Sequence, residues 1–138
     1  MMIFTFITDS FRGFPDKTDI ISYVSQNKEM LMDCINNQDY TKLNESKTIE
    51  DITDYDDTEE DGKLVGFECG YSGFASESSY WGFFYSEKDA PDALCSTPIE
   101  ESELSPDDDG YLWEDSYGDN TYYVEKICDH FYYYEESY

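Results

Sequence analysis

Basic residues are scarce in this chain. Its 138 residues include 8 Lys and Arg against 33 Asp and Glu, which gives a formal net charge of −25. A protein that binds nucleic acid through phosphate contacts needs clustered Lys and Arg, and an anionic membrane repels so acidic a surface. We therefore expect no direct binding to nucleic acid and no binding to membranes.

Long apolar runs are also missing. No stretch of the sequence approaches the ~20 apolar residues that a membrane-spanning helix needs. The N-terminal residues MMIFTFITD carry no basic segment and only a short apolar one. They are typical of a buried strand over residues 2–8 rather than of a signal peptide. A chain without a signal peptide is expected in the cytoplasm, where its cysteines stay reduced.

Motifs for catalysis or cofactor binding are few. The four cysteines, Cys34, Cys69, Cys95 and Cys128, form no C-x-x-C pair, so the simplest interpretation is that they are buried apolar side chains. His130 is the single histidine, and neither glycine-rich phosphate-binding motif, GxxxxGK[S/T] or GxGxxG, occurs. We expect that the protein is not an enzyme and uses no cofactor.

Aromatic residues, by contrast, are abundant. They make up 18% of the chain, with 14 Tyr, 9 Phe and 2 Trp. Acidic disordered segments are poor in such residues, so this composition favours a folded core. The length is that of one domain, spanning residues 1–138.

One long helix is predicted in the first third of the chain. Apolar residues recur at helical spacing between Ile20 and Ile35, after a helix cap at Asp16 or Thr18. The helix is expected to stop near residues 36–37. Residues 40–61 are polar and are predicted as a flexible stretch with at most a short second helix.

The remaining residues indicate strands. Residues 64–69 alternate in polarity, residues 80–87 are strongly aromatic, and the Gly/Ser-rich residues 70–79 between them are typical of a turn. After an acidic loop over 90–109, a hairpin is predicted from residues 111–115 and 121–127, and residues 130–138 extend that strand or end as a helix. The predicted class is α+β: a mostly antiparallel sheet with an N-terminal strand and one main helix packed on it.

A calcium loop is one hypothesis for residues 57–68. They match the EF-hand pattern except for Glu59 at the third position, with Gly62 and Glu68 in their expected places. An EF-hand needs a helix on both sides, and here the next segment is typical of a strand. A calcium-binding module is therefore kept only as an alternative function.

The acidic residues are concentrated after residue 49, where the sequence has 26 acidic residues and 3 basic ones. Too few bases are present there for compensating ion pairs. We take the three densest blocks as a candidate partner-binding surface. The first block is Asp54, Asp56, Asp57, Glu59, Glu60 and Asp61; the second is Glu100, Glu101, Glu103, Asp107, Asp108 and Asp109; the third is Glu114, Asp115 and Asp119.

The charge is close to that of DNA of the same length. A globule of this size is roughly 37 Å across, and B-DNA of that length carries about 22 phosphates. Exposed tyrosines could also stack on the Arg and Lys of a nucleic-acid groove. The candidates are Tyr122, Tyr123, Tyr132, Tyr133 and Tyr134.

In composition and in these acidic blocks the chain resembles the DNA-mimic proteins of phages and mobile elements, namely anti-CRISPR and anti-restriction proteins. The resemblance implies an inhibitor that acts in the cytoplasm of an infected bacterium. Its partner would be a basic nucleic-acid-binding protein, a CRISPR nuclease whose DNA- or PAM-binding groove the acidic face occupies. The alternatives are an anti-restriction protein and an immunity protein that neutralises a cationic toxin. The sequence leaves open whether the chain forms a homodimer.

The three blocks are not expected to contribute equally. The second and third blocks flank the predicted hairpin, whereas the first falls in the predicted flexible stretch. A rigid element places a charge at a lower entropic cost than a flexible one. The sequence therefore predicts that the second and third blocks dominate binding.

Overall fold

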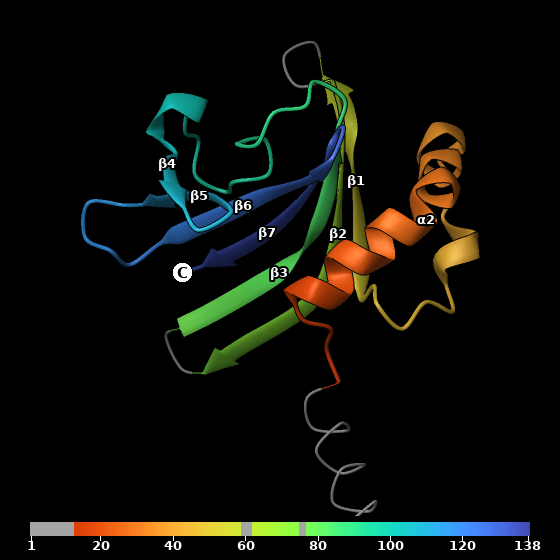
Figure 1. Ribbon diagram of the computed structural model, residues 1–138, viewed down its shortest axis with the longest axis horizontal. Coiled ribbons are helices and arrows are strands. Elements are labelled where there is room, and N and C mark those ends of the chain that lie inside the picture. The colour runs from red at the N-terminus through yellow and green to blue at the C-terminus, as the bar shows by residue number, and fades with distance from the viewer. Residues whose placement is uncertain (1–12, 59–61, 75–76) are drawn as a thin grey trace, which may run out of the picture.

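A seven-stranded antiparallel sheet forms the centre of the computed structural model, which describes residues 13–58, 62–74 and 77–138 (Figure 1). The strand order is β1-β2-β3-β7-β6-β5-β4. The strands are β1 (Asp51–Thr58), β2 (Gly62–Phe74), β3 (Glu77–Ser86), β4 (Ser105–Asp107), β5 (Gly110–Glu114), β6 (Thr121–Cys128) and β7 (Phe131–Ser137). With one long helix against it, this sheet confirms the α+β class.

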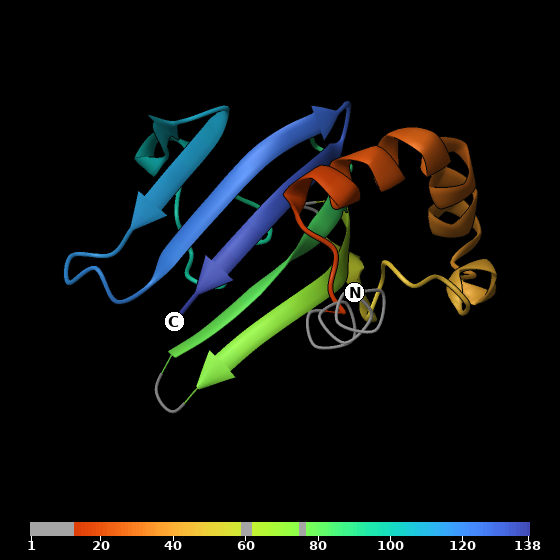
Figure 2. The same ribbon diagram turned by 60° about the horizontal axis from the view of Figure 1, so that its bottom comes forward.

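The helix α2 (Lys17–Asn37) forms where the periodicity predicts it. The Asp16 carboxylate accepts the backbone N–H of Asp19, and the Asp19 carboxylate accepts that of Asp16, which closes a capping box. At the other end Gln38 adopts a left-handed conformation and stops the helix. A break at Asn27, where φ is −118°, bends the helix, so that its two halves run in different directions (Figure 2).

The face of the sheet under α2 holds the larger core. Ile20, Val24, Leu31 and Ile35 of the helix are fully buried there. They pack on alternate residues of the strands, including Phe67 and Phe83, whose rings stack at 4.5 Å. The predicted alternation of residues 64–69 is thus confirmed, with Val65, Phe67 and Cys69 on this face.

The opposite face of the sheet is covered by irregular chain rather than by a helix. The segment between β3 and β4 crosses it, with a short 3₁₀ turn η2 (Glu101–Glu103) near its end (Figure 1). Its apolar residues, Ala93, Leu94, Cys95, Ile99 and Leu104, pack on a second cluster formed by Leu64, Phe84, Tyr122, Val124, Tyr132 and Tyr134. The predicted acidic loop therefore has an apolar inner side.

The turn predicted over residues 70–79 is wrong. Strand β2 continues to Phe74 and β3 begins at Glu77, and the two strands pair as far as Phe74 with Glu77. Gly70 pairs with Trp81 in this ladder. The residue is a glycine because the Trp81 indole packs onto its backbone, where a β-carbon would lie 2.5 Å from the ring. Here the glycine marks a close approach of a large side chain, not a turn.

The flexible stretch predicted over residues 40–61 is also wrong for its described part, residues 40–58. It contains a 3₁₀ turn, η1 (Thr41–Leu43), and the edge strand β1, which pairs with β2 from Asp51–Glu68 to Thr58–Gly62. The sequence is polar because the strand lies at the edge of the sheet, where charged side chains discourage pairing with other chains. The N-terminal strand predicted over residues 2–8 lies outside the described residues.

The β1–β2 hairpin also decides the interpretation of the EF-hand pattern. Its flanking segments are strands, so the helices that an EF-hand requires are absent on both sides. The four cysteines are free thiols; Cys34 and Cys69 are buried, and Cys95 and Cys128 are partly buried. Burial raises the pKa of the Cys69 thiol well above its usual range.

Candidate acidic interface

The second acidic block lies at one edge of the sheet. Glu100 caps η2, and Glu101 and Glu103 belong to it. Asp107 ends strand β4, and Asp108 and Asp109 form the turn into β5. All six residues are exposed. The turn is tight because Asp107 pairs with Gly110, and Asp108 adopts a left-handed conformation with φ of 54°. This edge strand is only three residues long and contains Pro106, so it offers little backbone to another strand.

The third block lies at the other end of β5, in the loop to β6. Glu114 and Asp119 are exposed, but Asp115 has a different role. Its carboxylate accepts the backbone N–H groups of Tyr117 and Asp119 at 3.1 and 2.9 Å and the side-chain amide of Asn120 at 3.0 Å. Asp115 therefore fixes the loop, and its neighbours offer their charges to solvent.

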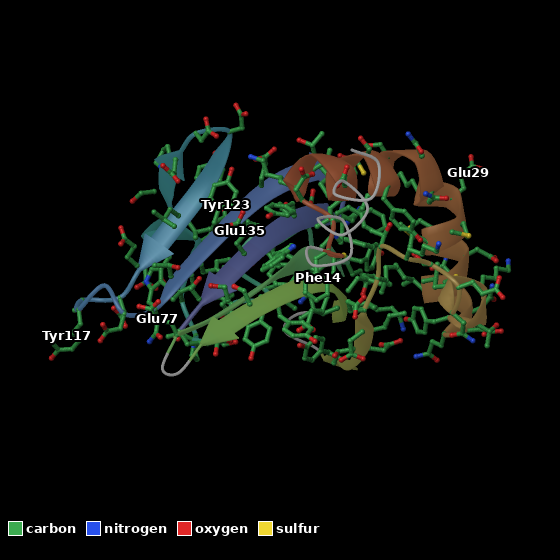
Figure 3. The ribbon with its side chains drawn as sticks, turned by 90° about the horizontal axis from the view of Figure 1, so that it is seen from below. Phe14, Glu29, Glu77, Tyr117, Tyr123 and Glu135 are labelled. Atoms are coloured by element: carbon green, nitrogen blue, oxygen red, sulfur yellow. The ribbon has the colours of Figure 1, made fainter. Side chains whose placement is uncertain are left out.

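The second and third blocks lie on and beside β4 and β5, and we call their exposed carboxylates the acidic edge. It consists of the exposed residues Glu100, Glu101, Glu103, Asp107, Asp108, Asp109, Glu114 and Asp119. The sequence contains no Lys or Arg between Lys88 and Lys126. Figure 3 shows Tyr117, at the tip of the β5–β6 loop, at the opposite end of the molecule from Glu29 of α2.

The ion pairs of the described residues do not include a carboxylate of the acidic edge. They join Lys17 to Glu125, Lys42 to Asp33, and Lys126 to Asp89 and Asp129. Lys17 lines a shallow hollow together with Asp107 and Asp108, but its ammonium is bound to Glu125 at 2.9 Å. This hydrogen bond raises the pKa of Lys17 to about 12. The carboxylates of the acidic edge are thus left without a cation partner among the described residues.

The described part of the first block, Asp54, Asp56 and Asp57, lies on β1, at the opposite edge of the sheet. Asp54 accepts a hydrogen bond from the Tyr40 hydroxyl at 2.6 Å, which ties the strand to the segment that follows α2. Glu59, Glu60 and Asp61 lie outside the described residues, as do the side chains of Asp56 and Asp57. The structure therefore places the second and third blocks on and beside β4 and β5 at one edge of the sheet, and the described part of the first block at the other edge.

Most of the tyrosines proposed for stacking are in the core. Tyr122, Tyr132, Tyr133 and Tyr134 are at most 6% exposed, so their assignment to the surface is wrong; Tyr123 is half-buried. The reason is that both faces of β6 and β7 are covered. Tyr111 and Tyr117, at 47% and 89% exposed, lie beside the acidic edge instead. The sequence could have identified Tyr111 and Tyr117 as candidates for stacking, because both lie in the predicted hairpin between the acidic residues of the second and third blocks.

The uncompensated charge leads to a prediction about stability. Repulsion between exposed carboxylates is screened by salt over about 8 Å at physiological ionic strength. The melting temperature should rise by several degrees between low and physiological NaCl, since about 1 kcal/mol corresponds to roughly 3–5 °C for a domain of this size. Differential scanning calorimetry measures this shift. A melting temperature that does not change with NaCl would mean that the charges are already compensated.

No family model, no curated protein and no solved structure matches this chain. Among the described residues, no helix is long and apolar enough to cross a membrane. The same part of the chain holds no cluster of three or more His, Cys, Asp or Glu side chains arranged to bind a metal ion.

Proposed function

We propose that this protein is a DNA-mimic inhibitor of a bacterial defence nuclease, in the first instance a CRISPR nuclease. The observation that carries the proposal is the acidic edge, with its eight exposed carboxylates and no cation partner among the described residues. In this proposal the acidic edge binds in the basic groove in which the nuclease would otherwise hold its DNA duplex.

The density of charge on the acidic edge supports this proposal. Strand β5 has five residues and spans about 17 Å, with acidic residues at both of its ends. B-DNA carries about ten phosphates over 17 Å, and the whole acidic edge, which extends beyond β5 to η2 and to the β5–β6 loop, carries eight carboxylates. Arg and Lys side chains spaced to contact phosphates would therefore find a comparable number of negative charges.

The hairpin architecture also supports the proposal. The carboxylates lie on or beside strands that pair with the rest of the sheet, and Asp115 holds the β5–β6 loop by three hydrogen bonds. Charges held in place lose little entropy on binding. Tyr111 and Tyr117 lie next to them and can stack on arginine side chains of the partner.

A competition experiment tests the proposal. Fluorescence anisotropy of a labelled DNA duplex is measured with a guide-loaded CRISPR nuclease, a restriction enzyme or a cationic nuclease toxin, with and without this protein. We expect it to displace DNA from one of these proteins, to bind no DNA itself, and to act more weakly as NaCl is raised. A stable complex that contains the target, its DNA and this protein together would contradict the mimic, and displacement only from the toxin would identify an immunity protein.

A further inference from the structure

A second acidic feature lies away from the acidic edge. It is a hollow of about 330 Å³ on the face of the sheet opposite α2, formed by β1, β2, β3, β7 and the segment around Leu94 and Ser96. Carboxylates and tyrosines line it, and none of its lining residues is Lys, Arg or His. They include Asp51, Glu68, Glu136, Tyr55, Tyr80 and Tyr134.

The register of the sheet explains why this hollow is open. Glu68 pairs with Asp51 on β1 and with Gly82 on β3, and Gly82 pairs with Tyr134 on β7. Because Gly82 carries no side chain, backbone alone separates Glu68 from Tyr134. Further along β2 the backbone of Gly66 is also bare, and Leu94 and the Tyr55 ring lie 3.3 and 3.6 Å from where its β-carbon would be. Gly66, which lines the hollow without a side chain, thus leaves part of the space that the carboxylates and rings surround.

Glu136 is a buried carboxylate without a cation. It is 8% exposed, and its oxygens accept hydrogen bonds from the Ser96 backbone N–H at 2.7 Å and from the Ser96 hydroxyl at 3.1 Å. It takes part in no ion pair among the described residues. A buried negative charge without a cation nearby costs folding free energy, and each oxygen of the Glu136 carboxylate can accept a further hydrogen bond.

The Tyr134 hydroxyl points to a ligand independently of the carboxylates. Tyr134 is 6% exposed, and its hydroxyl forms no hydrogen bond with a described residue. No fully enclosed side-chain oxygen of the described residues lacks a partner, so this hydroxyl must reach the hollow that its ring lines. Beside it, burial raises the pKa of the Glu68 carboxyl, and the charges of Asp51 and Glu50 raise it further. A cation with N–H donors in the hollow would give the Tyr134 hydroxyl a hydrogen-bond partner and would stabilise the ionised form of Glu68.

We propose that this hollow binds a guanidinium group. A guanidinium offers five N–H donors in one plane, which suits carboxylates on two sides, and its flat face stacks on tyrosine rings. A quaternary ammonium has no N–H and would leave Glu136 and the Tyr134 hydroxyl unmatched. A lysine ammonium has donors but no flat face. The guanidinium comes either from a free small molecule or from an arginine of a bound protein, and only the second source rests on the proposed function.

NMR titration of the full chain tests this site with defined probes. The probes are the blocked tripeptide Gly-Arg-Gly, the same peptide with citrulline or lysine in place of arginine, and free arginine amide. The variants are Glu136→Gln, which keeps an oxygen for Ser96, and Tyr134→Phe, which removes only the hydroxyl. Glu77→Gln, on the exposed start of β3, is the matched control for the loss of one charge.

We expect the arginine peptide to shift the signals of residues 51–55, 66–68, 94–96 and 134–138. Citrulline and lysine peptides should bind at least about tenfold more weakly, and Glu136→Gln should weaken the arginine peptide by about tenfold or more, because a hydrogen bond to a charged group is lost. Tyr134→Phe should weaken it several-fold, and Glu77→Gln should leave it unchanged. Equal affinity for arginine amide and the peptide assigns a small molecule; tighter binding of the peptide assigns a protein side chain.

The opposite results would overturn the site. These are no shifts, shifts scattered over the acidic edge, or equal responses to the arginine and lysine peptides. Failure of the DNA competition experiment would leave the guanidinium site standing, since the hollow and the acidic edge lie on different elements. Conversely, a failed titration would not affect the acidic edge.

Discussion

Under the proposed function, reversing the charge of three residues on the acidic edge, Asp107→Lys, Asp109→Lys and Glu114→Lys, is expected to abolish inhibition of the nuclease. Each of these side chains is exposed, and none accepts a side-chain hydrogen bond within the described part of the protein. The folded state should therefore tolerate the change. A close ion pair lost from a desolvated interface costs roughly 2–5 kcal/mol, so the three reversals together should raise the dissociation rate by more than about 100-fold.

Two further variants make this result specific. Glu29→Lys, Glu45→Lys and Glu77→Lys change the net charge by the same amount at exposed positions that do not belong to the acidic edge. This control should mainly slow association and reduce its salt dependence, because it weakens only long-range attraction. Reversals at Asp56, Asp57 and Glu60 should act in the same way. Surface plasmon resonance gives the association and dissociation rates. If the reversals at Asp56, Asp57 and Glu60 increase the dissociation rate and those on the acidic edge do not, the partner binds at the β1 side of the sheet instead.

The substitution Gly82→Ala is expected to destabilise the fold by about 3 kcal/mol or more. A β-carbon at this position would lie 2.0 Å from the carbonyl oxygen of Phe67 and 3.0 Å from the backbone nitrogen of Cys69. Both atoms belong to the neighbouring strand, at the register shift of β2 between Glu68 and Gly70. Backbone cannot move aside as a flexible side chain can, so the strands must separate or lose their register.

Gly73→Ala is the matched control for this substitution. Its β-carbon would lie 3.2 Å from the Ser78 hydroxyl oxygen, which can rotate away, and the residue is exposed. Urea unfolding followed by circular dichroism should show a change of less than about 1 kcal/mol for Gly73→Ala and a much lower midpoint for Gly82→Ala. Equal midpoints for the two variants would mean that β2 and β3 do not approach as closely as described.

The parts of the fold that local chemistry determines could be predicted from the sequence. Helix α2 has both a cap at Asp16 and a 3.6-residue period, and the β5–β6 hairpin has two short apolar segments around a polar loop. Strand β7 lacked such a signal. Three consecutive tyrosines, Tyr132 to Tyr134, do not alternate in polarity, because the strand is central and buried on both faces.

The site could be predicted only where its residues are neighbours in sequence. The second and third blocks are runs of acidic residues, and the β5 strand brings them to one edge. The guanidinium hollow gave no signal because Asp51, Glu68 and Glu136 come from three different strands. Only strand pairing, which depends on contacts between distant residues, brings these groups together.

The position of β7 has a consequence for how the protein forms. Strands β1 to β3 make one meander and β4 to β6 make another, and β7 is the strand that joins them, because it pairs with both β3 and β6. During synthesis the ribosome releases six strands before β7, and until then two inner strand edges stay unpaired. Folding of the sheet is therefore completed only after β7 emerges, and a nascent chain stalled before that point exposes the edges at which misassembly begins.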